Sequence, residues 1–171
     1  RLASTTEFVP AGGTVAGGGR ALARNSSGSF NNAIGYLALF NNSTGSGNNA
    51  LGHFALINNY GGSGNNALGD QALTNNSSGS YNNALGYQSL YNNTIGSDNT
   101  AFGYQSLYQN TTGIANSAIG NSALKNNITG SNNIANGNFT LLNATSTSNN
   151  IAFGPQALRG TSTGYVSGEN N

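Results

Sequence analysis

A repeat of 17 residues runs through almost the whole chain. Counted from a recurring Asn, the third residue of each copy is Ala, the fifth is Gly and the ninth is Leu, as in Ala84, Gly86 and Leu90. Nine copies cover residues 14–166 without an insertion, and the first of them is degenerate. Repeats of this kind are typical of solenoids, in which each copy forms one coil that packs on its neighbours.

The pattern of each copy predicts two short strands and two turns. In "NNALGYQSLYNNTIGSD" (residues 82–98), Gly86 interrupts the apolar pattern and Gly96 lies in a longer polar turn. The segments are too short for helices, and Gly and Asn adopt the left-handed conformations that corners require. The pattern predicts an all-β fold, a parallel β-solenoid (β-roll) of nine 17-residue coils over residues 14–166, with an N-terminal extension over 1–13 and a short tail over 167–171.

Alternation along the first segment predicts which side chains face inward. The fourth residue is large and apolar in seven copies, and we expect it in the interior together with the ninth-position Leu, so that Leu90 and Phe102 are core residues. The third-position Ala and the small eighth residue then face outward, against a partner. The alternative is that the Ala faces inward and fills a narrow corner beside the Leu.

Composition argues against several functions. The chain has nine charged side chains and a net charge of +1, so it lacks the clustered Lys and Arg of a nucleic-acid-binding protein. No apolar run approaches the roughly 20 residues of a membrane span. The four acids do not pair, His53 stands alone, and the turns lack the Asp of calcium-binding β-rolls. We therefore expect no enzyme, metal site or cofactor. Since Met is absent, we expect a processed product or a piece of a longer protein.

Open solenoid ends expose unpaired backbone and must be capped or joined. The first copy has Gly17 at its fourth position, which predicts a vacancy in that coil. Leu2, Phe8 and Val9 in the extension are the candidates to fill it. They either extend across a subunit boundary as an added strand or fold back as a cap on their own coil.

Two further sets of residues are candidates for surface contacts. The tenth position is too apolar for plain solvent exposure and predicts an interface column formed by Phe40, Ile57, Tyr91, Tyr108 and Leu142. Asn-x-Ser/Thr sequences in the long turn are candidate glycosylation sites at Asn25, Asn42, Asn76, Asn92, Asn110, Asn127 and Asn143. Asn beside Ser or Thr is also what β-corners use, so the same residues have a purely structural interpretation.

The stretch "NTAFGYQSLYQNTTG" resembles the repeats of phage tail-fibre proteins and bacterial surface proteins that precede a self-cleaving intramolecular chaperone domain. Its "AIG" and "ALG" cores also resemble, more distantly, the head repeats of trimeric autotransporter adhesins, although the adhesin repeat is shorter. The resemblance spans all nine copies and implies a left-handed β-roll whose chains pack side by side in threes. For this chain we expect the same of Ala84, Gly86, Leu90 and their equivalents.

Three functions are consistent with these features. The first is a structural subunit of an extracellular filament or fibre, located at a cell surface or in a virion, whose partners are copies of itself in a filament or trimer. The second is an adhesin or phage tail-fibre module that binds surface carbohydrate through Tyr36, Tyr87 and Tyr104. The third is ice binding, which is less well supported because Thr lies in the turns rather than in a ladder on a flat strand.

Overall fold

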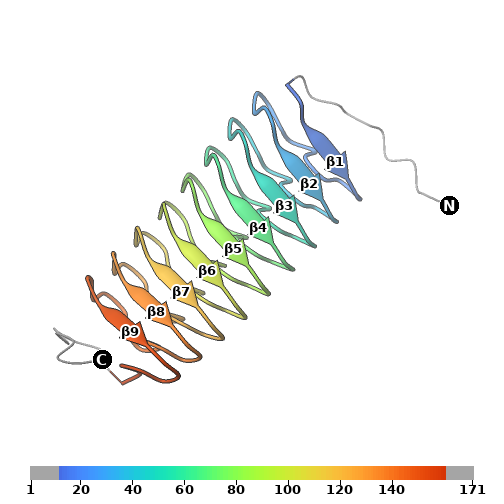
Figure 1. Ribbon diagram of the computed structural model, residues 1–171. Helices are drawn as coiled ribbons and strands as arrows, with labels where there is room; N and C mark the ends of the chain where they lie inside the picture. The colour runs from blue at the N-terminus through green and yellow to red at the C-terminus, as the bar shows by residue number, and fades with distance from the viewer. Residues whose placement is uncertain (1–11, 161–171) are drawn as a thin grey trace.

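The computed structural model describes residues 12–160, which wind into a rod of stacked coils (Figure 1). Each coil contributes one strand of three residues, and the nine parallel strands form one sheet in chain order. They are β1 (Val15–Gly17), β2 (Asn32–Ile34), β3 (Asn49–Leu51), β4 (Asn66–Leu68), β5 (Asn83–Leu85), β6 (Thr100–Phe102), β7 (Ser117–Ile119), β8 (Ile134–Asn136) and β9 (Ile151–Phe153). Each residue pairs with the one 17 positions later, as Ala33 does with Ala50. The predicted parallel β-solenoid is confirmed.

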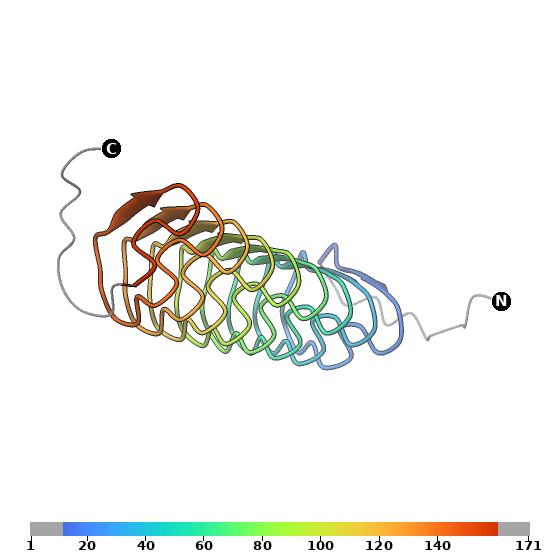
Figure 2. The same cartoon turned by 90° about the horizontal axis from the view of Figure 1, so that it is seen from below.

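The sheet occupies one side of the rod, and the rest of each coil returns along the other side (Figure 2). The second predicted strand is not a strand in the described residues, which is a correction. Its seventh and ninth positions have positive φ, as Gln88 (53°) and Leu90 (51°) show. The Gln88 N–H therefore donates to Asp70 in the preceding coil, while the Leu90 N–H donates to Ser106 in the following coil. The N–H groups of these two residues point toward opposite neighbouring coils, and the segment is not an extended strand.

The corner after each strand requires glycine. Gly86 has a φ of 131°, which an L side chain rarely adopts. A Cβ built on it would lie 2.7 Å from the Gly103 oxygen in the next coil. The prediction of a positive-φ corner at Gly86 is confirmed, and close stacking of the coils adds a second reason for glycine.

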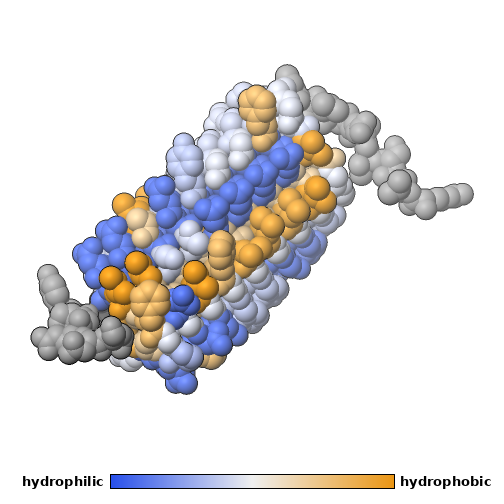
Figure 3. All heavy atoms as spheres, viewed as in Figure 1, coloured by the Kyte–Doolittle hydropathy of each residue, from blue (hydrophilic) through white to orange (hydrophobic). Residues whose placement is uncertain are grey.

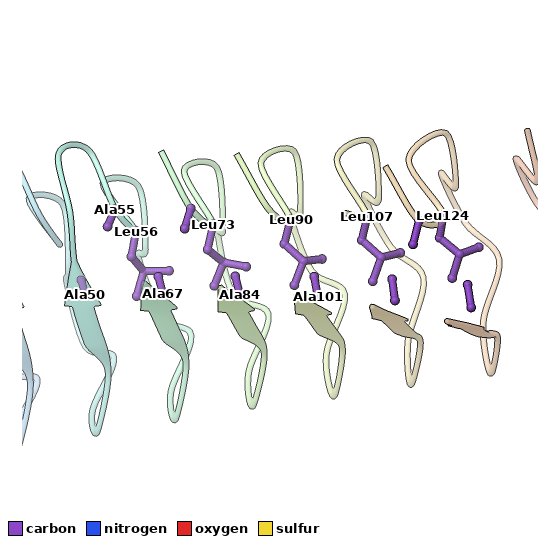
Figure 4. Packing of buried hydrophobic residues seen from close by; sticks show 14 of the residues in the cluster. Ala50, Ala55, Leu56, Ala67, Leu73, Ala84, Leu90, Ala101, Leu107 and Leu124 are labelled. Atoms are coloured by element: carbon purple, nitrogen blue, oxygen red, sulfur yellow. The ribbon is translucent and has the colours of Figure 1, made fainter. Parts of the chain in front are cut away.

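The apolar half of the interior contains the ninth-position Leu, the third-position Ala and the small eighth residue (Figure 4). Leu90 is fully buried, as predicted, and Ala101 and Ser106 are fully buried too. The expectation that the third and eighth positions face outward is wrong. The fourth position is outward instead, and Phe102 remains 39% exposed. The coil is narrow, so Ala is the side chain that fits opposite Leu, as the alternative interpretation held.

The other half of the interior is polar. The first-position and twelfth-position Asn side chains form two buried ladders, and in the six coils of residues 31–132 both donate to the carbonyl of the fifteenth residue. In one coil, Asn48 Nδ2 and Asn59 Nδ2 lie 2.9 and 2.8 Å from the Gly62 oxygen. Asn48 N also donates to Asn31 Oδ1 in the preceding coil (2.9 Å), and Asn59 Nδ2 to Asn42 Oδ1 (2.8 Å). These bonds satisfy buried polar groups that would otherwise destabilise the coil.

The twelfth-position ladder ends at Asn127. The next residue in the column is Ala144, and Asn127 Oδ1 is consequently buried with no hydrogen-bond partner in the described residues. The fifteenth residue of the same coil is Thr147 instead of Gly. In a regular coil the Asn oxygen lies within about 2.6 Å of a Cβ built at the fifteenth position, as Asn76 Oδ1 does at Gly79. Ala144 leaves room for the Thr147 side chain, so these two departures from the repeat pattern depend on each other.

We predict that the double substitution Ala144→Asn with Thr147→Gly stabilises the rod by about 1 kcal/mol, because a new Nδ2 reaches the orphaned Asn127 oxygen. Ala144→Asn alone should give no gain, since Thr147 would crowd the added amide. Urea unfolding of the two single variants and the double variant measures the coupling between them. Additive effects of the two substitutions would show that they do not form the continuing ladder.

Candidate interaction surface

The outer face of the sheet carries two continuous rows of side chains. The fourth position contributes the apolar row, whose members are 37 to 51% exposed: Ile34, Leu51, Leu68, Leu85, Phe102 and Ile119. Parallel strands in register place these six residues in neighbouring coils, one above the next. A contiguous exposed apolar stripe is typical of an interaction site. Figure 3 shows it as an orange band along the rod.

Beside it runs the amide row, formed by the second-position residues Asn32, Asn49, Asn66 and Asn83. The Nδ2 atoms of Asn32, Asn49 and Asn66 donate to the Asn Oδ1 of the next coil, at 2.7, 2.7 and 2.8 Å. Thr100 and Ser117 continue this position in β6 and β7. A groove between the rows is lined by Asn66, Leu68, Asn83, Ala84, Leu85 and Phe102. The face is therefore ordered by its own hydrogen bonds before any partner binds.

The apolar row has two definite ends. Before Ile34 the fourth position is Gly17, which has no side chain, and after Ile119 it is the polar Asn136. Gly17 lies at an outward position of β1, where a Cβ would approach Ile34 Cγ1 at 3.9 Å. The predicted vacancy inside the first coil is therefore wrong, because the fourth position does not point into the coil. Leu2, Phe8 and Val9, the residues predicted to fill it, lie outside the described residues.

The predicted interface column at the tenth position is less accessible than the apolar row. Phe40, Ile57, Tyr91, Tyr108 and Leu142 are all partly buried. Arg24 lies over the Phe40 ring at 5.1 Å, Lys125 lies over the Tyr108 ring at 5.9 Å, and the Tyr91 and Tyr108 rings stack at 5.3 Å. These side chains are packed against their own chain, so the column offers less free apolar surface than sequence reasoning assigned to it.

The tyrosines predicted to bind carbohydrate lie on the sixth position, just past the glycine corner. Tyr36, Tyr87 and Tyr104 are 42 to 49% exposed. Tyr87 and Tyr104 stack with centroids 5.5 Å apart, and Tyr36 stacks on His53 at 5.6 Å. Each ring in a pair therefore has one face covered by its neighbour, which leaves the edges and one outer face for a ligand.

Four of the candidate glycosylation sites are in the interior. Asn42, Asn76, Asn110 and Asn127 are fully buried, and the Nδ2 atom of each donates both to a carbonyl three residues later and to the Asn of the preceding coil. A glycan on this nitrogen would have no room in the folded coil, so these four predictions are corrected. Asn25, Asn92 and Asn143 are at least partly exposed and stay predictions.

Ionisable groups are sparse on this rod. His53 Nδ1 lies 3.6 Å from Asp70 Oδ2, and both side chains are about half exposed. Between residues 12 and 160, no three His, Cys, Asp or Glu side chains gather where they could bind a metal ion. The same residues contain no helix that is long and apolar enough to cross a membrane. The arrangement presents surfaces for contact and shows no cluster suited to acid–base chemistry in this part of the chain.

Comparison with known proteins adds no functional assignment. No family model, curated protein or solved structure matches this chain.

Proposed function

We propose that this chain is a rod-shaped structural subunit that associates side by side with copies of itself to form a fibre. The exposed apolar row on the outer face of β2–β7 is the observation that supports this proposal most strongly. A fibre located outside the cell or on a virion agrees with the resemblance of the repeats to those of tail-fibre and surface proteins. The proposal includes that location.

The composition of the sheet face suits a protein interface. No charged side chain lies at the second or fourth position of any described strand, and interface cores are depleted in charge. A stable interface buries about 800 Å² on each partner, of which six half-exposed apolar side chains supply roughly half. The amide row must therefore be covered together with the apolar row.

The regular spacing of the face favours a second copy as the partner. Neighbouring strands of the sheet are about 4.8 Å apart, so six residues of the apolar row span about 24 Å. A partner that contacts every one of them needs side chains at the same spacing. Another copy of this rod has that spacing, because its own strands stack with the same register.

We predict that Leu68→Glu together with Leu85→Glu lowers the association constant at least about tenfold, because two unpaired carboxylates would be buried in the contact. Both side chains point outward and are 37 and 46% exposed, so the monomer should keep its fold. Sedimentation velocity over a range of concentrations measures the effect, with circular dichroism as the check on folding. Ser78→Glu, on an exposed part of the long turn, is the matched control.

Unchanged association of the double variant would remove the apolar row from the interface. A chain that stays monomeric at every concentration would contradict the fibre proposal itself.

The second candidate function, carbohydrate binding, rests on the exposed Tyr87–Tyr104 stack and the adjoining Gln88–Gln105 amide pair, joined at 2.8 Å. Monomers that bind glycans on an array, and lose this binding on Tyr104→Ala, would support the carbohydrate-binding function in place of the fibre.

A further inference from the structure

Asn136 is a polar residue at the end of an apolar surface. In β8 the usual order of the two outward positions is reversed, with Ile134 at the second position and Asn136 at the fourth. The in-register neighbours of Asn136 at the fourth position are Ile119 in β7 and Phe153 in β9. The Asn136 side chain is exposed and makes no hydrogen bond with the described residues. The amide is therefore not held by a hydrogen bond within the rod of residues 12–160.

Covering the sheet face with a second rod would remove water from the Asn136 amide, which is unfavourable unless the amide gains a hydrogen-bond partner. The direction of the second rod decides which residue it meets. In parallel rods in register, Asn136 meets Asn136. In antiparallel rods with matched apolar rows, Ile34 lies against Ile119 and Asn136 lies against Gly17, which has no polar side chain.

A shift of parallel rods by one coil is also unfavourable. Asn136 would then lie against Ile119 or Phe153, which are its neighbours in the column. The same shift would leave one end of the apolar row exposed on each rod. A single polar residue within an apolar contact fixes the register of coiled coils for the same physical reason.

We propose that neighbouring chains in the fibre run parallel and in register, and that paired Asn136 side chains fix this register. The inference rests on the proposed side-by-side association, since it concerns the same surface. It adds the direction and the alignment of the chains, which the apolar row alone leaves open.

The absence of Cys from the chain permits a direct test by disulfide cross-linking. Ile34→Cys and Ile119→Cys lie near opposite ends of the apolar row. After mild oxidation of the assembled protein, we expect each variant alone to form disulfide-linked dimers. Antiparallel rods would give dimers only when the two variants are mixed, and that result would overturn the parallel arrangement while leaving the association intact.

The role of Asn136 is tested by Asn136→Leu in the same cross-linking experiment. A mixture of Ile34→Cys and Leu51→Cys reports rods shifted by one coil. In the native background we expect little of this shifted dimer. With Asn136→Leu we expect it to increase about fivefold or more while association is retained, because the polar residue that excludes the shift is gone.

Ser78→Leu adds an apolar side chain on the long turn, away from the sheet face, and should not change the shifted fraction. An unchanged shifted fraction in Asn136→Leu would overturn the role of Asn136. Monomers of the native chain in the sedimentation experiment would overturn both the fibre and its register. The three outcomes are therefore distinguishable.

Discussion

Gly62→Ala is expected to unfold or severely disrupt the middle of the rod, at a cost of about 3 to 5 kcal/mol. Gly62 does not have the positive φ of the corner glycines, so backbone conformation is not the reason. A Cβ there would collide with the Gly79 carbonyl oxygen of the next coil. It would also lie 2.5 Å from Asn59 Oδ1 and 2.6 Å from Asn76 Nδ2. The added methyl group has no flexible side chain to displace, because backbone and buried amides surround it.

The neighbouring residue provides the control. A Cβ at Gly61 meets only Thr44 Oγ1, at 3.6 Å, and Gly61 has no positive φ. Gly61→Ala should therefore leave stability unchanged or raise it by up to about 1 kcal/mol, because Ala restricts the unfolded chain. Urea unfolding followed by circular dichroism compares the two variants. Similar midpoints would show that the coils do not stack as closely at the long turn as this geometry requires.

Asn82→Ala is expected to lower the free energy of unfolding by about 3 kcal/mol or more, because several buried partners lose their bonds at once. Asn82 Oδ1 accepts from both Asn99 N and Asn99 Nδ2, each at 3.1 Å. Asn82 Nδ2 donates to the Gly96 oxygen at 2.8 Å and to Asn65 Oδ1 at 3.2 Å. Removing this amide breaks the fully buried ladder to both the preceding and the following coil.

Asn83→Ala removes an amide of the same size from the next residue, which belongs to the half-buried outer row. Asn83 Oδ1 accepts one bond, from Asn66 Nδ2 at 2.8 Å, and water can replace it. We expect its loss to cost about 1 kcal/mol or less. Thermal unfolding of both variants tests the difference. Equal destabilisation would mean that the buried ladder contributes no more than the surface ladder does.

The period of the sequence was sufficient to predict the fold. Leu90 and Gly86, with their equivalents in the other copies, predicted the buried side chain and the positive-φ corner of each coil. The corner is confirmed in all nine coils, and the buried Leu in all but the last, where Leu158 is partly buried. The pairing of each strand with the copy 17 residues later follows from the absence of insertions. Such predictions succeed because every coil of a solenoid has the same local structure, so each copy of the repeat gives independent evidence for that structure.

The inward or outward direction of the third-position and fourth-position side chains was predicted wrongly, and the reason is side-chain size. Large apolar residues were assigned to the interior, yet Leu85 and Phe102 are outside, while Ala84 and Ala101 are inside. Nine copies of Ala at the third position indicate a site that rejects any larger side chain, whereas the fourth position varies from Gly17 to Phe102. A position that accepts side chains of very different volumes is typical of a surface, and this signal was present in the sequence.

The interaction surface on the outer face of the sheet was not predicted from the sequence for the same reason. Ile34 and Leu68 belong to one column of the repeat, but their large apolar side chains predict a core position, and a core position predicts no interface. The polar interior was missed because Asn is usually a corner residue, and only the observed bonds to Gly45 and its equivalents show that Asn31 and Asn42 point inward. Periodicity alone does not distinguish a polar core from a polar turn.

The two buried Asn ladders have a direction along the rod. In both, the amide nitrogen of one coil donates to the oxygen of the coil before it, as Asn59 does to Asn42 and Asn82 to Asn65. The outer amide row runs the other way, from Asn32 Nδ2 to Asn49 Oδ1, so the side-chain dipoles of the rod partly cancel. Each buried ladder still presents amide donors toward the N-terminal end and amide acceptors toward the C-terminal end. A second rod continues the buried ladders only where an end that presents donors meets an end that presents acceptors. An end-to-end contact that continued these ladders would therefore be head to tail, and a filament that grew in this way would have two chemically different tips.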